Sequence, residues 1–479
     1  MIMVIARKEA LEIVRDGRFR WAAVSALLLL IAALLSGWAH YDRLAHQRTL
    51  ASATERTVWT TQQEKNPHST AHYGTWAFKP MTPLGMFDYG VTAYTGTAFF
   101  LEGHKIEGAA YRPVDDATGV ARLGELTAAI VLQWLIPLLI VLLAFDAFAG
   151  ERQRGTLRQL MSLGVAPGAL TLGKALGLAA PLGAVLVPAS IIGAAALLFG
   201  SSADGPSAEW GAWDFLRLGA LTLAYLAYFA LFIGLSLVVS MLSRAPRTAL
   251  LLLLAFWFGN AFVAPRLAND VAGMIQPGPD PAAFAIKKRT IAENRIAQFK
   301  ERVKAITERL MKENGIEAPD QLSVNVPGLN LFEIEVAETA AHRAFYKELG
   351  DAFEAQNAIV QAGALVAPLL AVQSLSMALA GTDYAHHRHF ADSAEEYRHN
   401  YVQRLNRNLR DNARPGDQWD SEYTAGSDLW ESIPAFTYEP PDPGWAIRHQ
   451  VTALFMLAIW LVGLLVFTRW AVRNMETVE

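Results

Sequence analysis

The sequence predicts an all-α integral membrane protein with six transmembrane helices and a mostly helical extracytoplasmic domain formed by two insertions. Hydrophobic side chains make up 53% of the 479 residues and charged ones 18%, which is too apolar for an ordinary soluble protein of this size. The apolar residues also form uninterrupted stretches that reach the roughly 20 residues a helix needs to cross a bilayer. Lys and Arg gather at the ends of these stretches instead of forming one basic face.

Six apolar stretches are predicted to span the membrane: residues 21–39, 126–148, 170–199, 215–242, 248–263 and 451–467. The first follows a basic segment and could therefore be a signal peptide. Its apolar run is longer than the usual ~7 to 15 residues of such a peptide, which favours a retained anchor.

Positive charges set the predicted orientation, because Lys and Arg near span ends are held on the cytoplasmic side. Basic residues occur in residues 1–20, 149–169 and 468–479. They also occur in the short link between the fourth and fifth spans. The link between the third and fourth spans carries Asp204, Glu209 and Asp214 but no Lys or Arg. Both termini are therefore predicted to be cytoplasmic, and the long segments 40–125 and 264–450 to be extracytoplasmic.

The second outer segment is predicted to contain a helical hairpin, because charged helical patterns run from Pro281 to Asn357 with a break from Gly315 to Gly328. Its apolar stretch, residues 363–380, could compete as a span. A further crossing would export the C-terminal arginines, so we assign this stretch to the outer domain, at the membrane surface. The first outer segment is rich in aromatic and turn residues and is predicted to form a compact lobe against the second.

Composition and motifs exclude several functions. The formal net charge of -4, without a basic face, indicates no nucleic-acid partner, and the absence of cysteine excludes disulfides and thiolate metal sites. The segment from Gly168 to Ala175 matches the phosphate-binding pattern G-x-x-x-x-G-K-[ST] except at its final position. The missing hydroxyl is the magnesium ligand, and no strand precedes the loop. The chain is therefore predicted to have no nucleotide site of its own, to bind no cofactor directly and not to be an enzyme.

Three histidines lie close together in the second outer segment: His386, His387 and His389. Imidazole is a common ligand of zinc, copper and nickel. No H-E-x-x-H or spaced carboxylate pattern accompanies them, so surface contacts are favoured over a metal site.

Four polar residues lie in or beside the predicted spans: Asp146, Lys174, Gln133 and Asn260. Ionisable residues inside a membrane are costly and often functional. Asp146 lies within reach of cytoplasmic arginines, which favours an ion pair over a transport site. Gln133 and Asn260 could hydrogen-bond between helices or face a substrate path, and Lys174 is predicted at the bilayer boundary.

The segment from Phe148 to Ser162, FAGERQRGTLRQLMS, resembles the cytoplasmic elbow of type-2 ABC exporter permeases, in which a Glu-rich stretch ending in Gly-Thr-Leu links the second and third spans. Gln153 departs from this pattern, since an acidic residue is often found there. Ile5 to Leu11 is similar to the amphipathic connecting helix of the same family, which places such a helix within residues 1–20. Short motifs after the first and fifth spans, including Phe78-Lys79-Pro80 and Ala380-Gly381-Thr382-Asp383, resemble a subgroup with large extracytoplasmic insertions there.

This resemblance implies a permease subunit in the plasma membrane of a bacterium. The partners that it implies are two copies of an ABC ATPase, which would bind ATP and Mg, and a second permease that is either this chain or a related one. The lipid bilayer and an extracytoplasmic protein are further expected partners. The implied ATPase contact comprises Glu151, Arg152, Arg154, Gly155, Thr156 and Leu157.

The expected function is thus coupling of ATP hydrolysis, in a separate subunit, to outward movement or membrane extraction of a substrate that the sequence does not identify. The main alternative is a membrane-anchored extracytoplasmic interaction or immunity protein. A weaker alternative is a membrane metalloenzyme that uses the histidine cluster.

Overall fold

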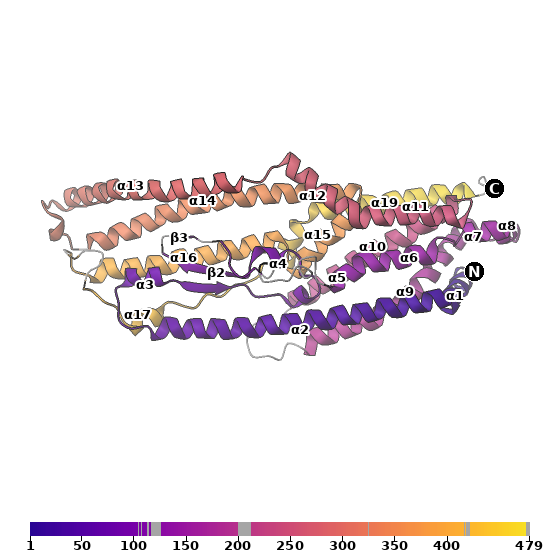
Figure 1. The fold of residues 1–479 in the computed structure, drawn as a ribbon, viewed down its shortest axis with the longest axis horizontal. Helices are drawn as coiled ribbons and strands as arrows, with labels where there is room; N and C mark the ends of the chain where they lie inside the picture. Colours follow the sequence, from indigo (N-terminus) through magenta and orange to yellow (C-terminus); the bar gives the residue numbers. More distant parts are fainter. Residues whose placement is uncertain are drawn as a thin grey trace.

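The computed structural model describes residues 1–103, 105–106, 108–112, 115, 126–199, 212–323, 325–415, 417 and 422–475. The molecule is elongated, and most of its helices run roughly along one axis (Figure 1). Both termini lie at one end of that axis. The helices α13, α14 and α16 extend toward the other end, together with three short strands.

Within the described residues, six helical segments are long and apolar enough to cross a membrane. The prediction of an all-α membrane protein with six candidate spans is confirmed. Their helices are α2 (Gly17–Thr61), α5 to α7 (Ala128–Ile130, Ile136–Ala144 and Ala149–Arg154), α9 (Pro167–Phe199), α10 (Ala212–Leu242), α11 and α12 (Pro246–Phe258 and Ala264–Ile275) and α19 (Val451–Arg473).

The helix α2 is much longer than a membrane crossing requires. Its 45 residues make it about 68 Å long at 1.5 Å per residue, whereas a bilayer core is about 30 Å thick. The segment predicted to span, residues 21–39, is only its N-terminal half. Its far end reaches a hydrophobic core that is separate from the core of the spans. There Trp59 packs edge-on against Tyr401, with ring centroids 5.6 Å apart.

The part of the molecule beyond the spans, here called the distal lobe, is formed by two segments far apart in the sequence. Its elements are α3 (Pro67–Tyr73), β1 (Thr75–Phe78), α4 (Thr92–Thr95), β2 (Ala98–Glu102), β3 (Lys105–Ile106), α13 (Pro281–Asn314), η5 (Pro319–Gln321), α14 (Val326–Ala362), α16 (Tyr384–Asn412) and α17 (Ser427–Ser432). Between β1 and α4, η1 (Pro83–Met86) packs against α2, α10 and α15 in the core of the spans. The strands form one antiparallel sheet in the order β1-β2-β3. The side chain of Asp280 caps the start of α13, and Gly315, with φ of 65°, ends it in the left-handed conformation that glycine favours.

The helices α14 and α16 are joined by a buried ion pair. Arg398 contacts Glu335 at 2.8 Å and Glu395 at 2.7 Å, and the side chains of Arg398 and Glu335 are 2% and 0% exposed. The third nitrogen of Arg398, Nη2, donates to the hydroxyl of Thr339. Satisfying several donors of one buried guanidinium in this way offsets its desolvation.

The apolar stretch 363–380 contains η6 (Gly363–Leu365) and α15 (Pro368–Ala380). It does not lie across a surface as its sequence suggested. Nearly every residue of α15 is buried, because α10, α19 and α18 (Pro443–Arg448) pack around it. Its serines and the free amide groups of its first turn can be buried because other helices supply hydrogen-bond partners, which are described below.

Candidate functional site

The predicted elbow forms a sharp bend between α7 and α8 (Thr156–Ser162), at the end of the molecule that holds both termini (Figure 1). Gly155 makes the bend with φ of 76°, a left-handed conformation that costs about 1–2 kcal/mol for a residue with a Cβ. The hydroxyl of Thr156 donates to the carbonyl of Glu151, 3.2 Å away. The Gly-Thr pair therefore closes α7 and starts α8.

The end of α10 holds the elbow in place. The hydroxyl oxygen of Ser240 accepts from the backbone N–H groups of Phe148 and Ala149 at 3.0 and 3.1 Å. N–H groups at the start of a helix have no acceptor within that helix, and Ser240 supplies one. Arg152 donates to the carbonyl of Ser243 at 2.8 Å, just beyond the C-terminal end of α10. These bonds tie the elbow's position to that of a spanning helix.

A buried charge network links the elbow to α1 (Ile2–Arg15) and α9. Lys174, which is 1% exposed, donates to Glu151 at 2.8 Å and to Glu9 at 2.9 Å. Lys8 lies 3.8 Å from the same Glu151 oxygen and 3.1 Å from Glu9. Burial, the largest single influence, would raise the pKa of Glu9, but the charges and hydrogen bonds of Lys174 and Lys8 together outweigh it, so the pKa is lowered.

The helix α1 lies directly against α9 because two glycines leave room for it. A Cβ at Gly173 would come within 2.7 Å of the side chain of Ile5, and one at Gly177 would come within 2.5 Å of Glu9 Cβ. The Gly173-Lys174 pair that imitates a phosphate-binding loop therefore serves helix packing and an ion pair.

The residues predicted to contact an ATPase differ in exposure. Arg154 and Gly155 are exposed, and Arg152 and Thr156 are half-buried. Glu151 and Leu157 are 5% and 1% exposed. Beyond them, Arg158 is exposed, as is Leu163, at 80%. The accessible surface of the elbow is thus basic with an apolar tip, while Glu151 faces inward.

Asp146 is half-buried on the inner side of the elbow. A Cβ added at Gly150 would lie 3.3 Å from both the Asp146 side chain and Arg154, so the glycine lies between them. Among the described residues, Asp146 makes no ion pair. Its charge is nevertheless close enough to interact with that of Arg154.

A chain of polar groups crosses the interior of the helix bundle. Gln133 donates to the hydroxyl of Tyr225 at 3.0 Å, which lies 3.0 Å from the hydroxyl of Ser376 in α15. The Ser376 hydroxyl in turn donates to the carboxylate of Asp88. Since each hydroxyl has one hydrogen, all donors in the chain point toward Asp88. These bonds join η3 (Val131–Leu135), α10 and α15 to the loop after η1.

A second set of bonds centres on Asn260 and Tyr228. Asn260 donates to the Tyr228 hydroxyl at 3.1 Å and accepts from the backbone N–H of Leu369 at 3.1 Å, capping α15. Tyr228 donates to the carbonyl of Gln133 at 3.2 Å. That carbonyl lacks the usual α-helical donor because Pro137, four residues later, has no N–H. Gln133 and Asn260 each lie in a π-helical turn, η3 and η4 (Gly259–Val263), a feature frequent at functional sites.

The chain matches two known protein families. Residues 3–307, more than half of the sequence, match the family described as ABC-2 family transporter protein. The chain belongs to this family. Residues 285–439 of this ABC-2 transporter protein match a family described as a domain of unknown function (DUF3526), and no curated protein matches the chain. The predicted membership is confirmed, whereas the subgroup with two insertions stays a prediction.

Membership in the ABC-2 family indicates a membrane subunit of an ABC transporter. Such a subunit works with an ABC ATPase and generally lacks ATPase activity of its own. The six candidate spans and the family together place the protein in a membrane.

The three histidines of this ABC-2 protein face different partners. His386 is buried beside Asp383 with 2.5 Å between its Nδ1 and a carboxylate oxygen, His387 stacks on Phe99, and His389 Nδ1 lies 3.0 Å from the Tyr438 hydroxyl. Within the described ranges, no group of three His, Asp or Glu side chains is arranged to hold a metal ion.

Sequence reasoning missed several residues of this arrangement. Tyr225, Tyr228 and Ser376 supply the partners of Gln133 and Asn260, and Ser240 caps the elbow. One available signal was the spacing of the two tyrosines, which places both on one face of an otherwise apolar helix.

Proposed function

We propose that this chain is the permease subunit of an ATP-driven exporter and that the ATPase docks on the exposed residues of the elbow. The observation that carries the proposal is the buried Glu151–Lys174–Glu9 network, which joins the elbow rigidly to α1 and α9. A push on α8 is thereby delivered to two helices at once. Glu151 acts as a positioning residue, while Arg154 and Arg158 provide the contact surface.

We further propose that two ATPase subunits, carrying ATP and Mg, bind a pair of permeases made of two copies of this chain or of this chain and a related one. The elbow and both termini then face the bacterial cytoplasm, and the distal lobe is extracytoplasmic. Two facts support this orientation: the elbow shares one end of the molecule with the termini (Figure 1), and basic residues cluster at that end. The substrate moves outward or is extracted from the membrane.

Affinity purification from native membranes in mild detergent tests the docking surface. A nucleotide-binding ATPase, identified by mass spectrometry, is expected to copurify with the unmodified chain and to be lost from Arg154→Ala/Arg158→Ala. The matched control is Arg302→Ala/Arg309→Ala, two exposed arginines of α13. It should retain the ATPase.

Two results would count against the proposal. If no ATPase accompanies the unmodified chain in several detergents, the anchored interaction or immunity protein becomes the better hypothesis. If the ATPase stays bound to the elbow double variant, the docking surface lies elsewhere on the chain.

A further inference from the structure

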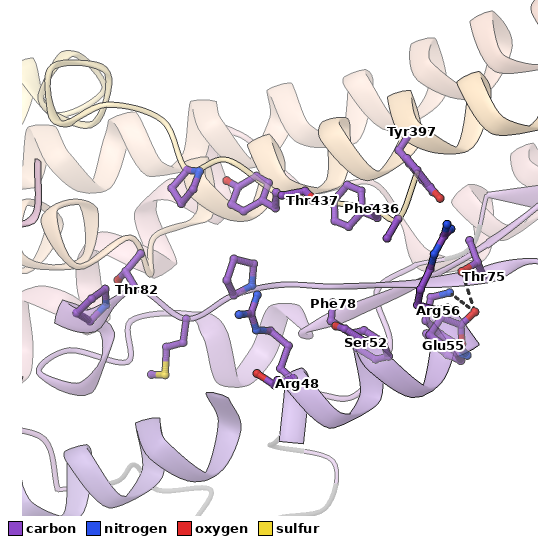
Figure 2. Close-up of a pocket in the computed structure, with 18 of the residues that line it drawn as sticks. Arg48, Ser52, Glu55, Arg56, Thr75, Phe78, Thr82, Tyr397, Phe436 and Thr437 are labelled. Carbon is purple, nitrogen blue, oxygen red and sulfur yellow. Dashed lines mark hydrogen bonds between the residues drawn. The ribbon is translucent and has the colours of Figure 1, made fainter. Parts of the chain in front are cut away.

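A cavity of about 610 Å³ lies at the junction of the distal lobe and the spans, far from the elbow. Figure 2 shows Arg48, Ser52 and Glu55 of α2 on one side and Phe436 and Thr437 on the other. The second wall belongs to residues 433–442, here called the C-terminal strap, which links α17 to α18. The start of α10 contributes Trp213, Asp214 and Arg217 to the lining.

Side chains of three helices hold the strap in place through its backbone carbonyls. Arg56 of α2 donates to Ile433 at 2.7 Å, Tyr397 of α16 donates to Pro434 at 2.8 Å, and Arg217 of α10 donates to Pro441 at 2.6 Å. Because the strap is held at both of its ends, the cavity has a defined wall.

Arg217 is the unusual group in this cavity. It is 3% exposed, and its Nη1 has no hydrogen-bond partner among the described residues. Nor does any carboxylate of the described part of the chain form an ion pair with it. A buried guanidinium that keeps a free donor is costly, and an anion in the cavity would remove that cost.

The lining as a whole carries one net positive charge. Arg48 and Arg56 are balanced by Glu55 and Asp214, so the uncompensated charge is that of Arg217. Glu55 already accepts from the hydroxyl of Thr75 at 2.7 Å and from the N–H of Trp76 (Figure 2). Arginine is suited to phosphate because its planar fork can bind two oxygens at once.

Part of the remaining lining is apolar, and the cavity reaches the start of α10, which is one end of a candidate span. Trp76, Phe78, Met81 and Phe436 contribute apolar surface. Trp213, at the start of α10, is 60% exposed, as is typical of tryptophans at the headgroup level of a bilayer. A ligand for this cavity therefore has an anionic end and an apolar end.

We propose that this cavity binds an anionic phospholipid, with the phosphate at Arg217 and the start of an acyl chain against Phe78 and Phe436. The volume is within the usual range for ligand sites, about 300–1,000 Å³. The site does not depend on the proposed ATPase coupling, since binding is measured on the permease chain alone.

The test uses the purified full chain in nanodiscs of phosphatidylcholine that contain a small share of phosphatidylglycerol with a photoactivatable acyl chain. After irradiation and proteolysis, label is expected on peptides containing residues 76–83 and 433–442. Arg217→Gln should reduce this label roughly tenfold or more, because the phosphate loses its charge-assisted bonds. The control Arg247→Gln, an exposed arginine at the start of α11, should keep it.

A second variant covers the possibility that Arg217→Gln misfolds. Ser52→Trp should fill the cavity from α2 while leaving Arg217 in place, and it should also remove the label. Ala53→Trp, exposed on another face of the same helix, should not. Unlabelled phosphatidylglycerol should displace the probe. Displacement by millimolar glycerol phosphate or inorganic phosphate would identify a soluble anion as the ligand and overturn the lipid assignment, as would label that persists in both cavity variants.

Discussion

Replacing Lys174 with methionine should destabilise the protein more than any single change on the elbow surface. The substitution keeps the length of the side chain and its packing over Phe148, but it removes the cation that binds Glu151 at 2.8 Å and Glu9 at 2.9 Å. Two charge-assisted hydrogen bonds at about 1.5–3 kcal/mol each give a loss of about 3–6 kcal/mol. Lys8, 3.8 Å from Glu151, recovers part of it, so we expect about 3 kcal/mol.

A double-mutant cycle measures this interaction. Lys174→Met, Glu151→Gln and the double variant are compared with the unmodified chain by unfolding in detergent. Once the cation is gone, neutralising Glu151 removes a stranded charge. The double variant should therefore be less destabilised than the sum of the singles by about 1–3 kcal/mol. Lys312→Met, on the exposed surface of α13, is the control for loss of a lysine and should change stability by less than about 0.5 kcal/mol.

Two results would refute this expectation: a Lys174→Met protein as stable as the control, or two single effects that simply add. Either result would mean that the contacts at Lys174 are made equally well with water, and the rigid link between elbow and α1 would have to be given up.

Three further predictions follow from other contacts. Gly177→Ala should detach α1 from α9, because even a methyl group would come within 2.5 Å of Glu9 Cβ. Protease cleavage within α1 should therefore become faster. Burial and the charges of Lys79 and Arg112 lower the pKa of His387 to about 3, so the unfolded chain binds a proton that the folded chain rejects. Stability should therefore be fully present above pH ~6.5 and fall by about 1–2 kcal/mol between pH 7 and 5, an effect absent from His387→Phe in unfolding measurements. Tyr228→Phe should cost about 1–2 kcal/mol of unfolding free energy, since the carbonyl of Gln133 loses its donor.

Each of these has a control. Gly183→Ala lies on α9 with open space around it and should leave α1 protected. His46→Gln, on the exposed face of α2, should retain the full pH dependence. Loss of the pH dependence in both histidine variants, equal cleavage in both glycine variants, or a Tyr228→Phe protein as stable as the parent would contradict the corresponding argument.

The spans could be predicted because a bilayer demands long apolar runs, and such runs are visible one residue at a time. The length of α2 could not, since beyond residue 40 its sequence is polar and its helix is stabilised by the lobe. Glu55, for example, bonds to β1, and Arg56 bonds to the strap more than 370 residues away in sequence. The burial of α15 also depends on distant groups, namely Asn260 at its start and Tyr225 at Ser376.

In the elbow, too, one feature could be predicted from local sequence and another could not. Its Gly-Thr bend was recognisable from a local pattern, whereas the inward direction of Glu151 depends on Lys174, 23 residues later, and on α1. The pattern therefore located the elbow but did not distinguish residues that support it from residues that face a partner.

The length of α2 has a mechanical consequence. A continuous rod of about 68 Å that tilts by about 5° at its base moves its tip by about 6 Å, and no break in the helix absorbs the motion. Ser52 lies on the outer part of that rod, while Thr437 belongs to the strap opposite it. A change of tilt near the termini would open or narrow the gap between these two residues, so a pair of spin labels placed there would report on events at the opposite end of the molecule.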